Sequence, residues 1–367
     1  YPATDGESIV IMNDIRCLRA LGHEVFLYCL NTRRHRIDIS DFHNYSYWND
    51  FKSSEIDPNS FITLFQSIFS SFPFQISRFF DSKIEKNIEN YAKVNGIDTV
   101  ICQGLAMTLY SRKLTFLKKI YRVHNVEHSI WKNLARNSFN IIKKIALDQI
   151  ANSLKKFEMN ELNSFEWIVS LSKNEEQFFK KNYESKSICI AINLSNEFLS
   201  EYHSQSEGLL FIGSLDWLPN REGLDWFLNE IYPSISHIPL TIAGKGDFNI
   251  KNQENITVIS NFDFLEDLFS RHRLMIVPLK SGAGIRIKIL EAMLYGMPTI
   301  STLIGAEGIE LAEDTILLRN TSNEWVQCIQ NSYYNTELLK KFSSQMKSQY
   351  HKNYSLESIK TVWEQVI

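Results

Sequence analysis

Residues 278–310, with the sequence PLKSGAGIRIKILEAMLYGMPTISTLIGAEGIE, carry the strongest fold signal in the chain. The apolar run that ends at Val277 predicts a strand, which is followed by a glycine-containing loop and a helix over residues 285–295. Gly296 supplies a helix stop, and Pro298 begins the next strand. This order predicts a strand–loop–helix–strand unit of a parallel α/β sheet.

The same stretch is typical of an anion site. Gly282 and Gly284 let the backbone approach a ligand, and the start of the helix presents unpaired amide groups that favour an anion by up to ~2 kcal/mol. Arg286 and Lys288 fall in the first turn, where the helix dipole disfavours cations, so a nearby phosphate would explain them. Each charge-assisted bond to it would contribute about 1.5–3 kcal/mol. The alternative is an ordinary loop and helix with solvent-facing cations.

Strand-like and helical runs alternate on both sides of this stretch. The strand candidates cover residues 25–30, 99–102, 120–123, 167–171, 188–192, 209–212, 240–243, 256–259, 274–277, 299–301 and 316–318. The clearest helical stretches cover residues 7–21, 139–162, 337–350 and 356–367, the last two split at Asn353 and Tyr354. Two sets of alternating strands and helices predict an α/β protein of two Rossmann-like, doubly wound parallel-sheet domains.

The predicted domains are residues 1–203 and 204–354, divided in the polar stretch 200–207. A final helix, residues 355–367, is placed where it can pack back on the first domain. A length of 367 residues fits two such domains. A net charge of −3 argues against a nucleic-acid partner.

Composition predicts a cytoplasmic protein. Five scattered cysteines form no C-x-x-C pair, which favours a reducing compartment. The sequence opens with no charged-then-apolar signal, and its apolar runs are shorter than the roughly 20 residues of a membrane span. The aromatic-rich residues 44–80 have nearer to helical spacing. They predict a helix pair on the first domain or, alternatively, an apolar wall for a lipid-linked acceptor or peripheral contact with the inner face of the plasma membrane.

The segment at 278–310 resembles the donor-binding signature of family-4 retaining glycosyltransferases with the GT-B fold. FIGSLDWLPNREGLDWFLNEIYP at 211–233 resembles the opening strand and helix of that family's second domain. YRVHNVEHSIWKNLARN at 121–137 resembles the segment that crosses into the cleft from the first domain. The resemblance therefore implies two Rossmann-like domains that face each other across a cleft.

For the nucleotide-sugar donor, the resemblance implies that Glu291 accepts hydrogen bonds from the ribose hydroxyls. A buried, apolar-flanked glutamate is costly without such partners, which supports this role independently. The backbone from Gly284 through Ile285, with Arg286 and Lys288, is implied to contact the diphosphate.

Other donor positions match less closely. Ser214 stands where many relatives have a phosphate-binding arginine, and the following lysine position falls near Asn220 or Arg221. Asn261 and Phe262 stand where relatives hold the base. Ala283 stands where relatives have a glutamate that contacts the donor sugar. The resemblance implies that this change alters sugar recognition more than activity.

In the first domain, the resemblance makes His124 the catalytic histidine that points at the transferred sugar. Asn125 and Glu127 are implied to position donor or acceptor, and His128 matches more weakly. The family's first strand and glycine-rich loop are represented only by Gly6.

The implied function is a hexosyltransferase-type enzyme of class EC 2.4. It would transfer a sugar from a nucleotide-diphosphate sugar to an acceptor hydroxyl with retention, in bacterial surface-polysaccharide synthesis. The acceptor would be a glycan or a lipid-linked glycan. No Asp-x-Asp motif is evident, so neither a metal nor another cofactor is expected. The alternatives are a catalytically silent nucleotide-sugar-binding scaffold and a nucleotide-sugar epimerase on the same fold.

Overall fold

The computed structural model describes residues 6–32, 48–61, 63, 65, 70–138, 140–194, 206–246, 255–260, 265–282, 284–311 and 315–367. The chain divides into two compact units. Unit 1 comprises Tyr1–Ile192 together with Ile359–Ile367, and unit 2 comprises Asn193–Ser358. The domain boundary predicted at 203/204 lies outside the described residues.

Unit 2 is built on six parallel strands. In chain order these are β7 (Leu209–Ile212), β8 (Leu240–Ala243), β9 (Ile256–Ile259), β10 (Leu274–Val277), β11 (Thr299–Ser301) and β12 (Leu317–Leu318). Their order across the sheet is β12-β11-β10-β7-β8-β9. From β7 the chain adds β8 and β9 on one side of the sheet, and then β10, β11 and β12 on the other side, so the strand order reverses between β7 and β10. In a doubly wound sheet, such a switch point is where ligands bind, beyond the carboxyl ends of the strands.

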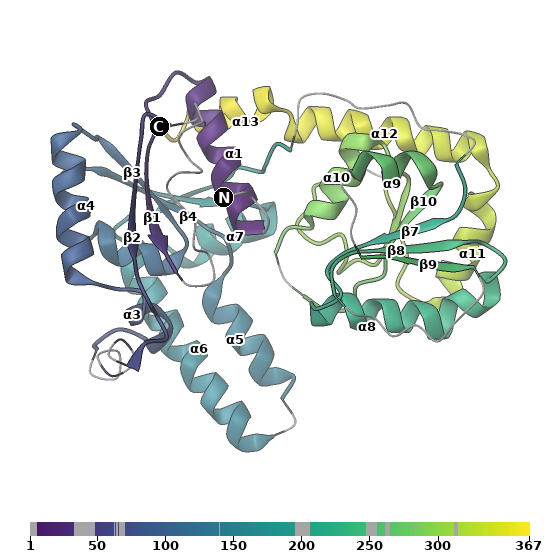
Figure 1. Ribbon diagram of the computed structural model, residues 1–367, viewed down its shortest axis with the longest axis horizontal. Coiled ribbons are helices and arrows are strands. Elements are labelled where there is room, and N and C mark those ends of the chain that lie inside the picture. Colours follow the sequence, from purple (N-terminus) through teal and green to yellow (C-terminus); the bar gives the residue numbers. More distant parts are fainter. Residues whose placement is uncertain are drawn as a thin grey trace. The chain divides into compact units, whose positions relative to one another are not determined.

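The strands of unit 2 form where the sequence is wholly apolar. All four residues of β7 and all four of β10 are buried, as expected for central parallel strands covered on both faces. The helices are α8 (Leu218–Trp226), α9 (Leu265–Arg271), α10 (Ile287–Tyr295), α11 (Ser322–Tyr333) and α12 (Thr336–Tyr354). In Figure 1, α10 and α12 cover one face of this sheet and α8 covers the other.

Unit 1 has two separate parallel ladders. One pairs β1 (Phe26–Asn31) with β2 (Asp50–Glu55), and the other has the order β3-β4-β5-β6. The strands of the second ladder are β3 (Thr99–Gln103), β4 (Lys118–Arg122), β5 (Trp167–Ser170) and β6 (Lys186–Cys189). A cavity of about 530 Å³ is lined by residues of both β1 and β3.

The helices of unit 1 include a long hairpin. They are α1 (Gly6–Ala20), α3 (Phe74–Ser77), α4 (Ser82–Val94), α5 (Glu127–Arg136), α6 (Ile141–Leu162), α7 (Lys173–Asn182) and, across the division, α13 (Leu356–Trp363). Figure 1 shows α5 and α6 side by side, extending away from the strands of unit 1. The chain ends against β4, where Lys118 Nζ donates to the carbonyl of Ile367 at 2.9 Å.

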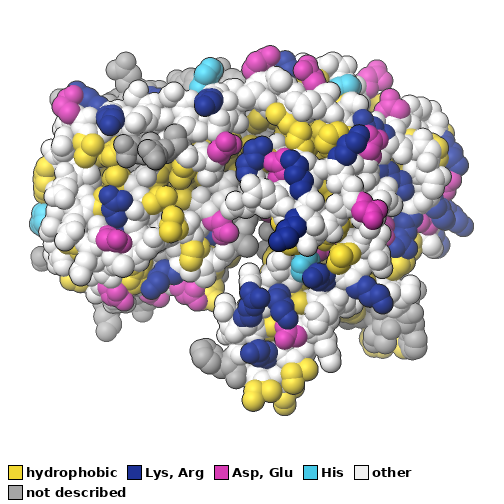
Figure 2. All heavy atoms as spheres, turned by 180° about the vertical axis from the view of Figure 1, so that it is seen from behind, with side chains coloured by type: hydrophobic (Ala, Val, Ile, Leu, Met, Phe, Trp, Pro, Cys, Tyr) yellow, Lys and Arg dark blue, Asp and Glu magenta, His cyan; other side chains and the backbone are white. Residues whose placement is uncertain are grey.

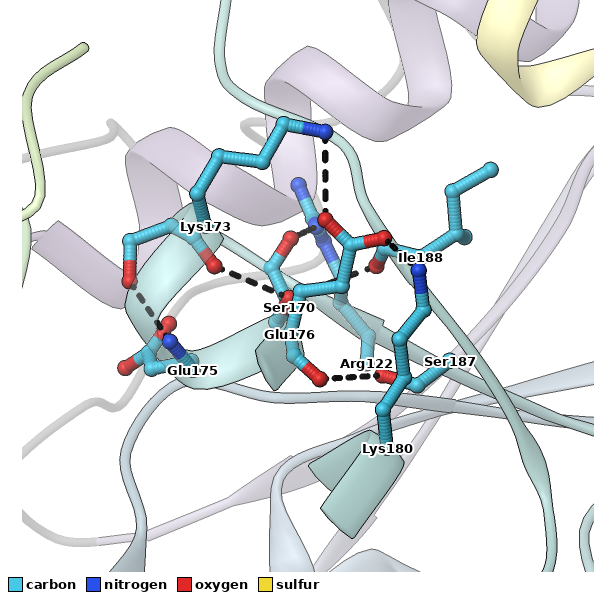
Figure 3. A network of polar contacts seen from close by, with 9 residues as sticks. Arg122, Ser170, Lys173, Glu175, Glu176, Lys180, Ser187 and Ile188 are labelled. Atoms are coloured by element: carbon cyan, nitrogen blue, oxygen red, sulfur yellow. Dashed lines mark hydrogen bonds and ion pairs between the residues drawn. The ribbon is translucent and has the colours of Figure 1, made fainter. Parts of the chain in front are cut away.

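A fully buried arginine ties the second ladder of unit 1 together. Arg122, the last residue of β4, forms a two-point ion pair with Asp14 of α1 and donates to the carbonyls of Ser170 and Ile190. Figure 3 shows this arginine beside the ends of β5 and β6. In the same view, Glu176 of α7 accepts from two lysines of that helix. The Arg122–Asp14 pair therefore joins α1 to β4, whereas the two contacts of Glu176 stay within α7.

Several predicted boundaries were wrong. α10 begins at Ile287, two residues after the predicted start, because the loop with positive φ at Gly282 and Gly284 continues to Arg286. β6 begins and ends earlier than the predicted 188–192. The two closing helices divide at Ser355, which has extended backbone and follows an unbroken α12.

The helix pair predicted for residues 44–80 was also wrong in part. Residues 50–55 form strand β2 instead, although they read DFKSSE. Backbone pairing with β1 determines this conformation despite the polar sequence. A large part of the remaining stretch lies outside the described residues.

Candidate functional site

The candidate site of unit 2 lies at the switch point of its sheet. β7 leads into the turn at Gly213 and then α8, and β10 leads into the glycine loop and then α10. The two turns meet: a Cβ added at Gly213 would lie 2.7 Å from Lys288 Nζ and 2.5 Å from Asn220 Nδ2. A larger residue would have to displace these side-chain ends, so glycine at this position allows the close approach of the two loops.

Lys288 and Asn220 form the centre of this site. Lys288 Nζ donates to Asn220 Oδ1 at 3.0 Å, and Asn220 Nδ2 donates to the carbonyl of Ser214 at 2.8 Å. Asn220 is buried, so its amide fixes the ammonium group above the turn. Burial lowers the pKa of Lys288 to about 7, the positive charge of Arg286 adds to this fall, and Glu291 opposes it. An added anion would stabilise the charged lysine.

Arg286 is the N-cap residue of α10, not part of its first turn as predicted. The side chain is buried, its guanidinium carbon lies 5.7 Å from the ring centroid of Trp217, and Nη2 donates to the carbonyl of Ile304 at 3.5 Å. Burial lowers the pKa of the guanidinium. The positive charge of Arg286 also contributes to the lowered pKa of Lys288, so the two cations act on each other near one helix start.

The start of α10 carries no side-chain cap. The amides of Ile289 and Leu290 bond back to the carbonyl of Arg286, at 2.8 and 3.3 Å. The two preceding amides, those of Ile287 and Lys288, are the ones that a helix of this length leaves for an external acceptor. An anion here would meet two amides, the helix dipole and two cationic side chains.

Glu291 lies one turn further along α10. Burial raises its pKa to about 7, and the charge of Lys288 opposes this rise. No hydrogen-bond partner of the carboxylate is found within the described ranges. A partly exposed carboxylate held without a protein partner is suited to accept bonds from ligand hydroxyls.

The other predicted donor residues divide into three groups. Arg221 donates from Nε to the carbonyl of Leu215, so this part of its side chain supports the turn after β7. Its Nη2 lies 4.0 Å from Asp216 Oδ1. Gly284 and Ile285 lie in the loop directly before α10. Phe262, Asn261 and Ala283 lie outside the described residues.

In unit 1, His124 follows β4 and is buried. Its Nε2 lies 2.8 Å from Gln103 Oε1, and Gln103 Nε2 donates to Asp14 Oδ2 at 3.0 Å. Asp14 in turn pairs with Arg122. This chain fixes the imidazole plane, and the sequence interpretation missed its two middle members. The available signals were an acid on the apolar face of α1 and a glutamine at the end of β3.

Other polar side chains predicted in unit 1 lie near His124 in the chain. Glu127 is the first residue of α5, and its pKa is raised to about 7 by burial and by the charges of Glu158 and Glu7. The charge of Glu7 acts there because the start of α1, including Gly6, lies at the same end of the unit. Asn125 is partly buried beside His124.

His128 has a structural role within unit 1. Its Nδ1 forms a short hydrogen bond to Glu158 Oε2, which joins α5 to α6. Glu158 is fully buried, so the imidazole provides this carboxylate with the partner it needs. His128, which matched the family only weakly, thus forms a hydrogen bond within the α5–α6 hairpin.

Two features are absent from the described part of the chain. Within those ranges, no three His, Cys, Asp or Glu side chains come together as metal ligands. The expected independence of metal remains a prediction. Among the same residues, no helix combines the length and apolar character that a membrane span requires.

The switch point, the uncapped helix start and its two cations are features with which doubly wound domains bind anionic ligands. Residues 206–335, all within unit 2, match the family model described as Glycosyl transferases group 1. This segment of unit 2 is therefore similar to group 1 glycosyltransferases, as the resemblance implied. One relative, an uncharacterized 44.6 kDa protein in the cps region of Klebsiella pneumoniae, is 26% identical over 336 residues, 84% of this chain and 81% of the relative.

Solved structures confirm the predicted fold class. Sucrose-phosphate synthase (tll1590) from Thermosynechococcus elongatus superposes with a TM-score of 0.70 at 14% identity, covering 99% of this chain and 92% of that chain. Alr3699/HepE of Anabaena, solved with UDP and glucose, gives 0.61 at 12% identity, covering 94% and 99%. The mixed α/β fold with parallel sheets is thus the GT-B fold.

Proposed function

We propose that this protein transfers a hexosyl group from a nucleoside-diphosphate sugar to an acceptor hydroxyl with retention at the anomeric carbon. The main support for this proposal is the uncapped start of α10, with Arg286 at its N-cap and Lys288 hydrogen-bonded to Asn220. Together they form a fixed cationic site for a diphosphate, and Glu291 follows as an acceptor for ribose hydroxyls.

In the proposed reaction, the bond between the anomeric carbon and the diphosphate oxygen breaks. Positive charge develops on the sugar and negative charge increases on the diphosphate. The amides of α10 with Arg286 and Lys288 would stabilise the leaving group, each preorganised donor contributing about 3 kcal/mol. His124, with its ring plane fixed by Gln103, would act beside the transferred sugar. The acceptor hydroxyl then bonds to the anomeric carbon on the face from which the diphosphate leaves, and its proton passes to the departing diphosphate oxygen.

The relatives suggest which substrates to test first. HepE was solved with UDP and glucose, so a UDP-sugar is our first candidate donor. The relative in a cps region supports an acceptor that is a growing bacterial surface polysaccharide, either free or lipid-linked. The predicted cytoplasmic location would give such an enzyme direct access to nucleotide sugars.

The decisive experiment measures binding and turnover separately. Titration calorimetry with UDP-, GDP-, ADP- and dTDP-sugars should identify one preferred donor. Arg286→Ala should weaken its binding at least ten-fold, because a charge-assisted bond to phosphate contributes about 1.5–3 kcal/mol. Lys280→Ala is the matched control: this exposed lysine lies in the same loop, but its ammonium is placed over Trp226 at 4.9 Å.

Turnover distinguishes the remaining alternatives. Release of nucleoside diphosphate, with acceptor or by slow hydrolysis, is expected of a transferase. Binding without any release would support the silent scaffold, and conversion of the donor to an epimer would support the epimerase. Equal donor affinity of Arg286→Ala and wild-type protein would contradict the phosphate assignment.

A further inference from the structure

The far end of the α5–α6 hairpin exposes a cluster of aliphatic side chains. The exposed fractions are 74% for Ile141, 81% for Ile142, 55% for Ile145 and 51% for Leu134. These four residues are called the apolar tip below. Ile141 and Ile145 are one helical turn apart and Ile142 is adjacent, so the isoleucines share one side of α6. Single exposed aliphatic residues are ordinary, but a group of four calls for an explanation.

The hairpin does not need these side chains for its own packing. Every residue from 140 to 146 is exposed, whereas Ala151, Leu154 and Phe157, further along α6, are buried. The first two turns of α6 therefore project beyond the part of the helix that packs on unit 1. Substitutions at the tip would therefore remove little internal packing.

Basic residues surround the apolar tip. Residues 132–146 contain Lys132, Arg136, Lys143 and Lys144 and no acidic residue. The next acid, Asp148, already pairs with Lys132 at 2.9 Å. Figure 2 shows the end of the hairpin as a projection at the bottom of the view, with hydrophobic side chains outermost and Lys and Arg side chains behind them. Apolar and positive surface thus occur together at one extremity.

We propose that the apolar tip inserts into the interface of a membrane that contains anionic lipids. Isoleucines can enter the boundary between headgroups and acyl chains, while flanking lysines keep their charges at the level of the phosphates. A projecting end with this charge is better suited to a lipid surface than to a flat protein interface. The sequence analysis predicted such contact at residues 44–80, part of which lies outside the described residues, and that prediction is not tested by the hairpin.

The position of the hairpin links this surface to the candidate site of unit 1. α5 begins three residues after His124, and its ten residues span about 15 Å. Docking would therefore hold His124 at a short, fixed distance from the lipid headgroups. If the proposed function is correct, this arrangement favours an acceptor carried on a membrane lipid. Docking itself does not depend on that function.

Vesicle co-sedimentation of the full chain tests the proposal. The probes are vesicles of phosphatidylcholine alone and of phosphatidylcholine with 30% phosphatidylglycerol, roughly a cytoplasmic-leaflet surface charge. Wild-type protein should bind the anionic vesicles and should dissociate at high salt. The variant Ile141→Ser/Ile142→Ser/Ile145→Ser should bind at least about ten-fold more weakly. Lys143→Gln/Lys144→Gln should lose roughly 25-fold, about five-fold for each charge.

The same helix provides a matched control. Lys155 and Lys156 form a second exposed lysine pair, about 18 Å further along α6. Lys155→Gln/Lys156→Gln should change vesicle binding less than two-fold. The proposal is overturned if wild-type protein ignores anionic vesicles, if the triple isoleucine variant binds like wild type, or if both lysine pairs contribute equally. Donor binding, measured in parallel, should be unchanged in all variants, so failure here is separate from failure of the proposed function.

Discussion

The two units repeat the same alternation of strand and helix but maintain their sites differently. In unit 2 the strands β7 and β10 are hydrogen-bonded neighbours, so one unbroken sheet positions both turns of the switch point. In unit 1 the ladder β1–β2 and the ladder β3–β6 are separate, and a cavity is lined by both. Among the described residues, strand pairing therefore joins the two sides of the switch point in unit 2 but does not join the two ladders of unit 1.

In unit 1, side-chain contacts join α1 to the four-stranded ladder. Asp14 of α1 contacts both Gln103 of β3 and Arg122 of β4, and Gln103 contacts His124. The helix beside the cavity is thus joined to the four-stranded ladder through a buried ion pair. The comparison teaches that the unit 2 site depends mainly on backbone pairing, whereas the unit 1 site depends on a few buried polar groups.

The largest effect is expected from Arg122→Met. This change leaves Asp14 buried without its cation, which should reduce the free energy of unfolding of unit 1 by about 3–5 kcal/mol. Denaturant unfolding followed by hydrogen exchange should show the loss in β3–β6 and leave the strands of unit 2 unchanged. Removing both charges with Asp14→Leu/Arg122→Met should restore part of the stability.

An exposed ion pair provides the control for this prediction. Lys93 and Glu89 are 54% and 24% exposed on α4, so Lys93→Met should cost less than about 1 kcal/mol. If Arg122→Met costs no more than that, the buried pair does not support unit 1 as argued. If unit 2 loses protection equally, the two units do not unfold separately.

A second prediction concerns the backbone of unit 2. Gly213→Ala places a methyl group 2.7 Å from Lys288 Nζ and 2.5 Å from Asn220 Nδ2. Both are ends of side chains that can move, so the fold should persist while the lysine is displaced. Affinity for the preferred nucleotide sugar should fall about ten-fold, the cost of roughly one charge-assisted bond. Calorimetry on the folded variant measures this.

A double-mutant cycle separates this explanation from general damage. Once Lys288→Met has removed the ammonium group, Gly213→Ala should weaken binding little further. Additive losses would mean that the glycine acts on the ligand independently of Lys288.

The sequence predicted the architecture of unit 2 better than that of unit 1. β7 to β11 were predicted to the residue, because short apolar runs bounded by glycine, proline or polar residues coincide with buried parallel strands. β2 was missed because its only large apolar residue is Phe51, and its pairing with β1 decides its conformation. Periodicity contains no information on such a non-local contact.

The candidate site residues could also be predicted from the sequence only in part. The cluster of Arg286, Lys288 and Glu291 follows from one continuous motif on one helix. The chain from Asp14 through Gln103 to His124 joins residues 89 and 21 positions apart, and no local pattern specifies those pairings. Asn220 was predicted as a ligand contact, yet its side chain holds Lys288 and the turn after β7.

A smaller effect should appear in the pH dependence of donor binding. The pKa of Lys288 is about 7 in the free protein, and an anionic ligand must raise it. A nucleotide sugar is fully ionised near neutrality, so its affinity should fall about five-fold between pH 7 and 8 as the free lysine loses its proton. Lys288→Arg should remove most of this dependence. Any remainder belongs to Glu291, whose pKa is also about 7; an unchanged profile would contradict the role of Lys288.

The smallest effect concerns Glu127 in unit 1. Its folded-state pKa of about 7 lies above the model-peptide value of 4.5. The folded state therefore binds this proton more tightly, and its stabilising contribution is complete below pH 4.5 and is lost as pH rises towards 7. Because the side chain is partly exposed, we expect only about 1 kcal/mol. Glu127→Gln should flatten the stability of unit 1 over this range, as measured by denaturant unfolding at pH 5 and 7.5. If the variant kept the wild-type slope, the pH dependence of unit 1 would not come from Glu127.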